Sequence, residues 1–363
     1  MGKLLAKFFG FLVLFAVIAA GGFWFYGQHL YTREGPKTDD GGARIVIISK
    51  GATVQSATAK LKAAGAIEDD FSFRAIVRAL DVIPGGEKLT LKAGEYSIAS
   101  GAPIKQVIKQ LSSGNSLQYN VVIPEGITSA AIMKRLAETD WPTTKPTTVS
   151  GVAKLTYQLS GDPPATPAEG VMLPGDYAVQ RGDTIESVVT RAIKRQQDLL
   201  AEVWPTRQDG LPFKTPEEAV NLASVVEKET GNASERPEVA AVFVNRLRRG
   251  MRLESDPTII YGITKGEPLG RTIRTSEKEA KTAWNTYQKA GLPETPICNP
   301  GAEAIRAVLD PPVSKNLFFV GDGTGGHIFA ETYAEHQRNV ADYWRIRDAN
   351  KAAGVNTPAV RRE

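Results

Sequence analysis

The stretch that decides the fold runs from Asn221 to Gly262 and reads NLASVVEKETGNASERPEVAAVFVNRLRRGMRLESDPTIIYG. It predicts two helices separated by a polar turn. In the first helix, the positions i, i+3, i+4 and i+7 are occupied by Leu222, Val225, Val226 and Glu229. A carboxylate therefore lies on the stripe expected to face the core. Glu227 projects roughly 160° away, so we expect it on the wetter face and only Glu229 to be buried.

A buried carboxyl group at position 229 has a chemical consequence. Aliphatic neighbours raise the pKa of a carboxyl group, which keeps it protonated near neutrality and lets it act as a general acid. The alternative is a capping or ion-paired glutamate at a helix C-terminus, with Gly231 as the stop. The spacing alone leaves both interpretations open.

The second helix is expected to begin at Asn232 or Ser234. Asn232 with Glu235 three residues later resembles a capping box, and Pro237 fits a first turn. The apolar stripe of this helix consists of Val239, Val242, Phe243 and Leu247, and Gly250 ends it. The segment Met251 to Gly262 is expected to be extended or turn-like, because Asp256-Pro257 should break any helix.

The same stretch carries a family resemblance. LASVVEKETGNASER and VFVNRLRRGMRLESDPTIIYG closely resemble the signature of the MltG-type (YceG-like) endolytic murein transglycosylases. The resemblance continues through AGLPETPICNPGAEAIRAVLDPP and NLFFVGDGTGGHIFAETYAEH to about Tyr343. In that family the catalytic residue is the second glutamate of the E-K-E-T motif, which corresponds to Glu229. The periodicity selects the same residue.

The resemblance implies a membrane-anchored enzyme that cleaves the β-1,4 bond between N-acetylmuramic acid and N-acetylglucosamine in nascent peptidoglycan. The product would carry a 1,6-anhydro end, and cleavage would terminate glycan strand elongation. No metal or cofactor is implied; the expected partners are glycan strands and, as candidates, peptidoglycan synthases (penicillin-binding proteins). Two alternatives remain: a non-catalytic peptidoglycan-binding scaffold that tethers synthases to the wall, and a hydrolytic muramidase in which Glu254 or Glu227 positions water.

Two residues near the motif depart from the family pattern. Glu254 in MRLESDP stands where the family commonly has Gln, and Trp284 in TAWNTYQ stands where it has Tyr. Trp284 still offers an aromatic face to a sugar ring. Glu254 is either a second carboxylate in the cleft or a surface charge. The candidate substrate-binding residues are Glu227, Glu254, Asn245, Tyr261, Trp284, Asn285 and Tyr287.

An apolar segment near the N-terminus predicts a membrane span. Phe8 to Gly27 contains twenty residues without a charge, enough to cross about 30 Å of hydrocarbon as a helix. Lys3 and Lys7 precede it, which favours a cytoplasmic N-terminus, and the segment ends in an aromatic belt. A cleaved signal peptide is the alternative. We favour a single-pass anchor in the bacterial inner membrane, with the catalytic part periplasmic.

A weak repeat follows the anchor, in which a β-rich run leads through a glycine turn into an amphipathic helix. Its four copies begin at Ile45, Tyr96, Val121 and Tyr177, and the helix caps are Thr53, Thr128 and Thr184. The copies resemble LysM-type units, which bind amino-sugar polymers, although a packing scaffold is an equal alternative. A further helix is expected at Phe71 to Ala79 and a further strand at Leu89 to Tyr96.

These features predict an α+β fold with a LysM-like strand–helix module and a lysozyme-like catalytic domain. Asp140 to Pro174 is expected to be a loop-rich connector, and Glu169-Gly170-Val171-Met172-Leu173-Pro174-Gly175-Asp176-Tyr177 matches the family's E-G-x-x-x-P-D-T-Y only loosely. The expected division is 1–7 cytoplasmic tail, 8–27 transmembrane helix, 28–43 tether, 44–115 LysM-like module, 116–348 catalytic domain with its core at 217–348, and 349–363 flexible tail.

Composition excludes several other classes. The chain has 363 residues and a formal net charge of +4, which suits an anionic polymer or lipid surface, but it lacks a basic-aromatic cluster for nucleic acid. The single Cys298 excludes an internal disulfide and is expected to be a buried thiol. The three histidines have no metal-ligand spacing. Gly321 to Gly326 fits G-x-G-x-x-G, but the following His327 to Ala330 predicts a return strand and hence a hairpin.

Overall fold

The computed structural model describes residues 2–83, 88–138, 168–181 and 183–352. They form two compact units, which are described separately below. The first contains the residues up to Tyr119 together with Ala178–Asp183, and the second contains most of the remainder. Most of the predicted connector and the end of the predicted C-terminal tail lie outside the described residues.

Helix α1 (Gly2–Thr32) contains the predicted span and is longer than predicted at both ends. An 18-residue window within its segment Lys7–Thr32 has a mean hydropathy of 2.3, and the segment is long and apolar enough to cross a membrane, a property that a signal sequence shares. Leu30 and Tyr31 pack against the core of the first unit. The predicted tether therefore begins only after Thr32.

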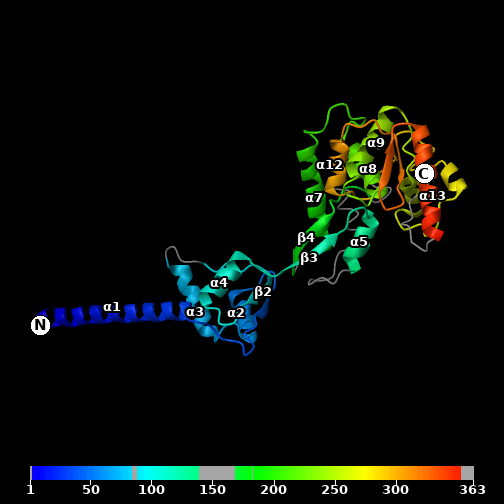
Figure 1. Cartoon of the computed structure of the whole chain (residues 1–363). Helices are drawn as coiled ribbons and strands as arrows, with labels where there is room; N and C mark the ends of the chain where they lie inside the picture. The colour runs from blue at the N-terminus through cyan, green and yellow to red at the C-terminus, as the bar shows by residue number, and fades with distance from the viewer. Residues whose placement is uncertain (1, 84–87, 139–167, 182, 353–363) are drawn as a thin grey trace. The chain divides into compact units, whose positions relative to one another are not determined.

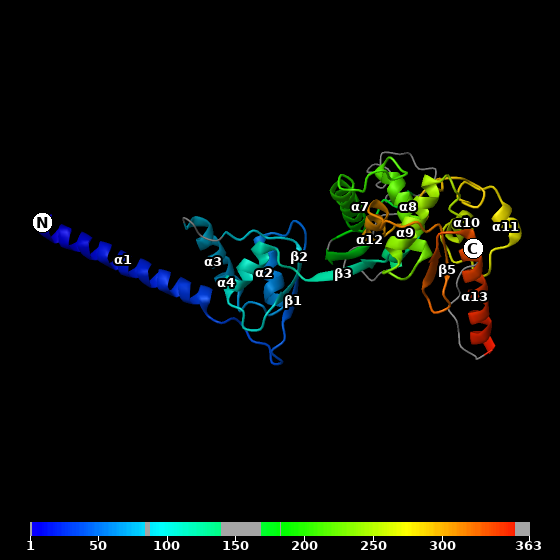
Figure 2. The same ribbon diagram turned by 45° about the horizontal axis from the view of Figure 1, so that its top comes forward.

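The first unit is a two-stranded antiparallel sheet packed against helices. Ile45 pairs with Ser97 and Ile47 with Glu95. These two isoleucines face outward, and the residues that alternate with them, Val46 and Ile48, lie in the core. Its elements are β1 (Arg44–Ile48), α2 (Val54–Ala63), α3 (Asp70–Val82), β2 (Gly94–Ile98) and α4 (Ile104–Ser113) (Figures 1 and 2). Every helix contributes fully buried side chains, among them Leu61, Phe73 and Leu111.

The predicted strand–helix repeat is confirmed. The four pairs are β1–α2, β2–α4, then β3 (Gln118–Ile123) with α5 (Ser129–Glu138), and β4 (Gly175–Gln180) with α7 (Ile185–Val203). Thr53 and Thr184 form capping boxes, and Thr128 Oγ1 accepts from the Ala131 N–H at 3.2 Å. Strand β2 starts at Gly94, later than predicted, because Leu89 and Leu91 pack on the core without strand pairing.

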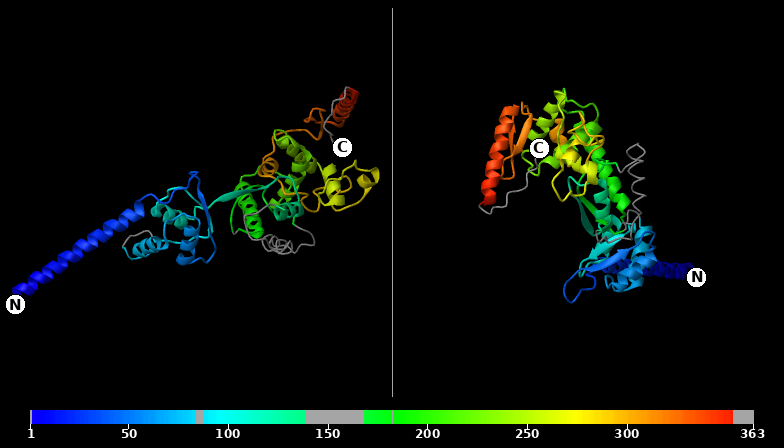
Figure 3. Two further views of the ribbon diagram at one scale, coloured as in Figure 1. Left: turned by 90° about the horizontal axis from the view of Figure 1, so that it is seen from below. Right: turned by 90° about the vertical axis from the view of Figure 1, so that its right-hand side faces the viewer.

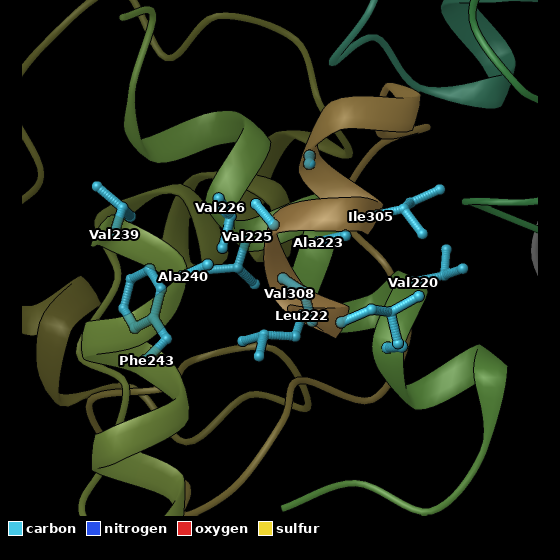
Figure 4. Packing of buried hydrophobic residues seen from close by; sticks show 14 of the residues in the cluster. Val220, Leu222, Ala223, Val225, Val226, Val239, Ala240, Phe243, Ile305 and Val308 are labelled. Carbon is cyan, nitrogen blue, oxygen red and sulfur yellow. The ribbon is translucent and has the colours of Figure 1, made fainter. Parts of the chain in front are cut away.

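The second unit is built around α8 (Pro216–Glu229). Every residue from Ala219 to Val226 is buried, so the helix is covered on all sides and is not amphipathic over this length. Its neighbours include α9 (Arg236–Arg248) and α12 (Ala302–Leu309), whose side chains interdigitate with it (Figure 4). Each fully buried Val, Leu or Phe contributes about 1.5–3 kcal/mol.

The glycine-rich motif is a hairpin turn, as predicted. It joins β5 (Phe318–Gly321) to β6 (His327–Ala330), which pair antiparallel with Gly321 opposite His327. Asp322 holds the turn by accepting from the N–H groups of Thr324 and Gly326. The last described element, α13 (Tyr333–Ala352), packs on this hairpin and contains the first residues of the predicted tail (Figure 3).

Two boundaries in the central stretch differ from the prediction. Helix α9 starts at Arg236, because Asn232 forms its own turn with Ser234 and Glu235 instead accepts from the His327 N–H at 3.0 Å. The expected capping box is therefore absent. Residues Asp256–Thr264 form helix α10, where no helix was expected. Pro257 lies in its first turn, where a missing N–H has no cost.

Candidate active site

Glu229 is the last residue of α8 and is half-buried. Its Oε1 accepts a short hydrogen bond from the hydroxyl of Ser255, the residue that precedes α10. Glu254, just before, has a left-handed φ of 52°, which turns the chain so that Ser255 meets the helix end. The candidate catalytic carboxyl is thus held by the start of a second helix.

Ser255 is itself fixed by a buried hydroxyl cluster. Its N–H donates to Thr286 Oγ1 at 3.0 Å, and its carbonyl accepts from Thr258 Oγ1 at 2.6 Å. The two threonine hydroxyls lie 2.9 Å apart, and all three residues are at most 1% exposed. A fully satisfied buried network of this kind is rigid. The direction of the Glu229 carboxyl therefore depends on three elements of the second unit.

Glu227 is buried, contrary to prediction. Its side chain is 7% exposed, accepts from the Gly301 N–H at 3.0 Å and lies 3.4 Å from the Arg236 guanidinium. Burial raises the pKa of Glu227, while the Gly301 N–H and the Arg236 charge oppose that rise. The helical wheel placed it on a wetter face, but the loop before α12 and the start of α9 cover that face. Glu227 thus ties three elements together beside Glu229.

A cavity of about 320 Å³ lies next to these glutamates, which we name the α10 cavity. Its walls are Gly126, Thr128, Lys228, Pro257, Ile260, Tyr261, residues 266–271 and Ile297. Glu229 is not among them; its neighbour Lys228 is, with its ammonium group donating to the Gly126 carbonyl at 3.1 Å. The α10 cavity therefore reaches the residue next to Glu229 in the chain, without Glu229 in its walls.

Glu169 is a second buried carboxyl group behind this cavity. It accepts from the Ser129 N–H at 2.8 Å and from the Tyr261 hydroxyl, whose ring lines the α10 cavity. Burial raises the pKa of Glu169 to about 7, and these hydrogen bonds act against the rise. The loosely matching motif that begins at Glu169 therefore reaches the site.

Two predicted substrate-binding residues form hydrogen bonds within the fold. The Asn245 amide donates to the carbonyls of Ser314 and Asn316 at 2.8 and 3.1 Å. Asn285 is 1% exposed and donates to three carbonyls around the short helix α11 (Thr275–Glu279). The amide N–H groups of both residues are thus used within the fold. Their role in substrate binding stays a prediction.

The three predicted aromatic residues cluster near α10. Tyr261 and Trp284 meet edge to face with ring centroids 5.6 Å apart, and the Tyr287 hydroxyl donates to Asp256 at 2.9 Å. The Lys265 ammonium lies 3.2 Å from the centroid of Trp284. One face of Trp284 is thus covered by a cation, which limits the aromatic surface expected for a sugar.

Glu254 stands apart from the α10 cavity. Its side chain is 46% exposed and pairs with Arg246 at 3.5 Å. It does not contribute to the cavity walls. Of the two interpretations of this residue, the geometry favours the surface charge.

Ser255, Lys228 and Glu169 were not among the predicted site residues. A usable signal for Ser255 existed, since serine immediately before Asp-Pro is typical of a helix start. No group of three metal-ligating side chains occurs in the part of the chain that the structure describes. Cys298 is fully buried, as predicted, with its Sγ 3.4 Å from the Ser224 carbonyl.

The signature around Glu229 and the mixed α/β architecture define a family. The YceG-like family model matches residues 46–342, and the chain belongs to this family.

Named relatives agree with this membership. The chain is 27% identical to proteins named endolytic murein transglycosylase from two strains of Streptococcus pneumoniae, covering 92% of this chain and 64% of theirs. It thus spans somewhat less than two thirds of those relatives. A Bacillus subtilis protein of the same name is 26% identical over 89% of this chain and 90% of its own. A crystal structure of a putative yceG-like protein from Listeria monocytogenes aligns with a TM-score of 0.48 and 24% identity, covering 82% of this chain and 98% of that one.

Proposed function

We propose that this protein is an endolytic lytic transglycosylase that cleaves the MurNAc–GlcNAc β-1,4 bond of nascent peptidoglycan. The observation that carries the proposal is the half-buried Glu229, hydrogen-bonded to Ser255 beside the α10 cavity. The family membership and the names of the relatives support the same substrate.

One carboxyl group is sufficient for this chemistry. Protonated Glu229 donates its proton to the glycosidic oxygen as the bond from that oxygen to the muramyl anomeric carbon breaks. The carboxylate then takes the proton of the muramyl O6 hydroxyl, whose oxygen bonds to the same carbon. The product is a 1,6-anhydro end, Glu229 is protonated again, and no water is consumed.

The hydrolytic alternative needs a second group to position water. Glu227 accepts from the Gly301 N–H and pairs with Arg236, and Glu254 pairs with Arg246. Both predicted helpers are thus engaged elsewhere, which supports transglycosylation over hydrolysis.

The non-catalytic scaffold alternative has its support in the first unit. The order β1–α2–α3–β2 is compatible with a LysM-like module that binds amino-sugar polymer. We propose that this unit assists substrate capture while the second, lysozyme-like unit carries the chemistry. The Glu229–Ser255 arrangement favours an enzyme over a pure scaffold.

We further propose that α1 is retained as a single-pass anchor in the inner membrane, with both units extracytoplasmic. Newly made strands emerge at that surface, where tethering raises the effective concentration of enzyme and substrate. Peptidoglycan synthases at the same surface are candidate partners.

Mass spectrometry of digested glycan tests the activity. Purified uncrosslinked peptidoglycan strands are incubated with the full chain in detergent, and the new ends are identified. Anhydro-muramyl ends support the proposal, reducing ends indicate a muramidase, and intact strands indicate a scaffold. The Glu229→Gln variant controls for contaminating enzymes.

Removal of residues 1–27 tests the anchor. The truncated chain keeps Leu30 and Tyr31, which pack on the first unit, so it is expected to stay folded and cut glycan in solution. The full chain is expected in the membrane fraction with its N-terminus intact. If expression of the full chain instead yields a shortened product in the soluble fraction that lacks the first residues, α1 is a cleaved signal.

A further inference from the structure

Helix α3 presents an exposed face with two large apolar side chains. Its buried residues Phe73, Ile76 and Val77 lie in the core of the first unit. On the opposite side, Phe71 is 78% exposed and Val82 77% exposed. Positions 71, 75, 78 and 82 follow helical spacing and share one side of the helix. Single exposed apolar residues are ordinary, so what distinguishes this face of α3 is the charge between the two residues and its place beside α1.

The same face carries positive charge. Arg74 and Arg78 are exposed between the two apolar residues. Within the described part of the chain, neither guanidinium has a carboxylate within ion-pair distance; Arg74 Nε donates to the Asp70 carbonyl at 3.3 Å. Nearby Asp70 lies 3.8 Å from Lys62, and Glu68 pairs with Arg33. The exposed carboxylate of Asp81 is a negative charge near the two arginines on α3.

The helix lies where α1 joins the first unit. Leu30 and Arg33 border a small depression with Asp69 and Ser72, the residues on either side of the start of α3. Figures 1 and 3 show α3 beside the C-terminal end of α1. If Phe8 to Gly27 fill the hydrocarbon core, the following turn of α1 is at headgroup depth. The start of α3 is then at the same depth.

We propose that this face of α3 docks on the bilayer that α1 crosses and binds anionic phospholipid headgroups. Phe71 and Val82 enter the interfacial region, and Arg74 and Arg78 bind phosphate groups. A membrane fits better than a protein partner, because the apolar residues are separated by arginines and lie about 16 Å apart along the helix. The inference rests on the proposed anchor. The contact between α3 and the bilayer would hold the first unit against the membrane surface.

Site-directed fluorescence tests the contact in the intact protein. The full chain is placed in nanodiscs with brominated acyl chains, and Phe71→Cys is labelled with bimane. Cys298 is fully buried and stays unlabelled, which the wild type verifies. The matched control is Ile47→Cys, 40% exposed on the outer face of the β1–β2 sheet in the same unit. A label at Val17→Cys reports whether α1 is inserted.

The expected result is quenching at positions 17 and 71 but not at 47. Adding phosphatidylglycerol to phosphatidylcholine discs should increase quenching at 71, and Arg74→Gln with Arg78→Gln should remove that increase. Quenching at 17 with none at 71 would overturn the docking surface and leave the anchor intact. Absence of quenching at 17 would overturn both. Equal quenching at 71 in the two lipids would refute the anionic headgroup as the ligand.

Discussion

The two units bury different kinds of side chains. The core of the first unit is apolar, and its buried polar residues among those described are Thr58, Glu95 and Ser116. In the second unit, buried polar residues gather where the end of α8 meets α10 and the loop before α12. They include Glu169, Ser224, Thr230, Arg236, Ser255, Asp256, Thr258, Thr286 and Asn299.

The buried groups of the first unit serve stability, whereas the buried polar groups of the second unit fit a functional site. A buried polar group costs free energy unless a hydrogen bond satisfies it, so an apolar core of the same volume would be the simpler route to stability. The second unit keeps its polar groups and satisfies many of them with hydrogen bonds such as those of Ser255 and Glu227, while Arg236 Nε and Asn221 Oδ1 are buried without a hydrogen bond among the described residues. The arrangement is what a site with a fixed carboxyl group requires.

The largest expected effect comes from Glu229→Gln. The amide keeps the shape but cannot donate the proton, so kcat should fall about a thousandfold, within the usual range for a general acid. The free energy of unfolding should change little. Turnover of purified glycan and urea denaturation measure the two effects.

Glu227→Gln is the matched control for that variant. It keeps an acceptor for the Gly301 N–H but loses the charge that pairs with Arg236. Most activity should remain, with a stability loss of about 1 kcal/mol. An inactive Glu227→Gln beside an active Glu229→Gln would reverse the assignment.

Glu169→Gln should change how stability depends on pH. Because the folded-state pKa of Glu169 is about 7 and its unfolded value is 4.5, the folded state binds the proton more tightly. The stabilising free energy from protonated Glu169 is therefore fully present below pH 4.5. It amounts to about 3 kcal/mol and is lost as the pH rises to 7. The amide should remove this slope and stabilise the second unit at pH 8.

Urea denaturation at several pH values, followed by tryptophan fluorescence, tests the Glu169 prediction. The exposed Glu217→Gln in the same unit is the control and should keep the wild-type slope. A Glu169→Gln variant with an unchanged slope would show that this carboxyl does not titrate differently on folding.

Ser255→Ala and Thr53→Ala compare one hydroxyl from each unit. Ser255→Ala removes a hydrogen bond to the Glu229 carboxyl, so kcat should fall about tenfold. Thr53→Ala removes the cap of α2 and should cost about 1 kcal/mol of stability with kcat unchanged. Similar losses of kcat in both variants would contradict the division between the units.

The smallest effect is expected from Glu254→Gln. Its side chain is half-exposed and pairs with Arg246, and an exposed ion pair contributes about 0–1 kcal/mol. The pH–rate profiles of the variant and the wild type should superimpose. A lowered acid-limb pKa in the variant would instead place Glu254 in the cleft with Glu229.

The local pattern was sufficient for many elements. Apolar alternation followed by glycine and threonine predicted four strand–helix pairs, and the caps at Thr53 and Thr184 formed as expected. The hairpin at Gly321 followed from the return strand. Each of these depends on residues a few positions apart, which is the range over which backbone preference and capping act.

Structure and prediction differ for two reasons, a local backbone preference that was misjudged and hydrogen-bond partners that the motif does not encode. Asp256-Pro257 predicts a break, whereas Pro257 lies in the first turn of a helix, where it is tolerated. Asn245 and Asn285 are predicted to bind substrate, and in the structure their amide N–H groups donate to carbonyls 69 to 71 and 5 to 8 positions away. The polarity of a residue in a motif does not show whether its side chain binds substrate or hydrogen-bonds within the fold.

The sequence by itself determined the apolar span, the strand–helix repeat and the family signature, and it named Glu229 as the candidate acid, because each depends on short-range spacing or a contiguous motif. Only the tertiary structure decided that Glu227 is buried, that Ser255 holds Glu229, and that Glu169 lies behind Tyr261. Those contacts join residues 26 to 92 positions apart. Burial and hydrogen-bond satisfaction at such sites are set by whichever segments fold over them, and a helical wheel carries no information about those segments.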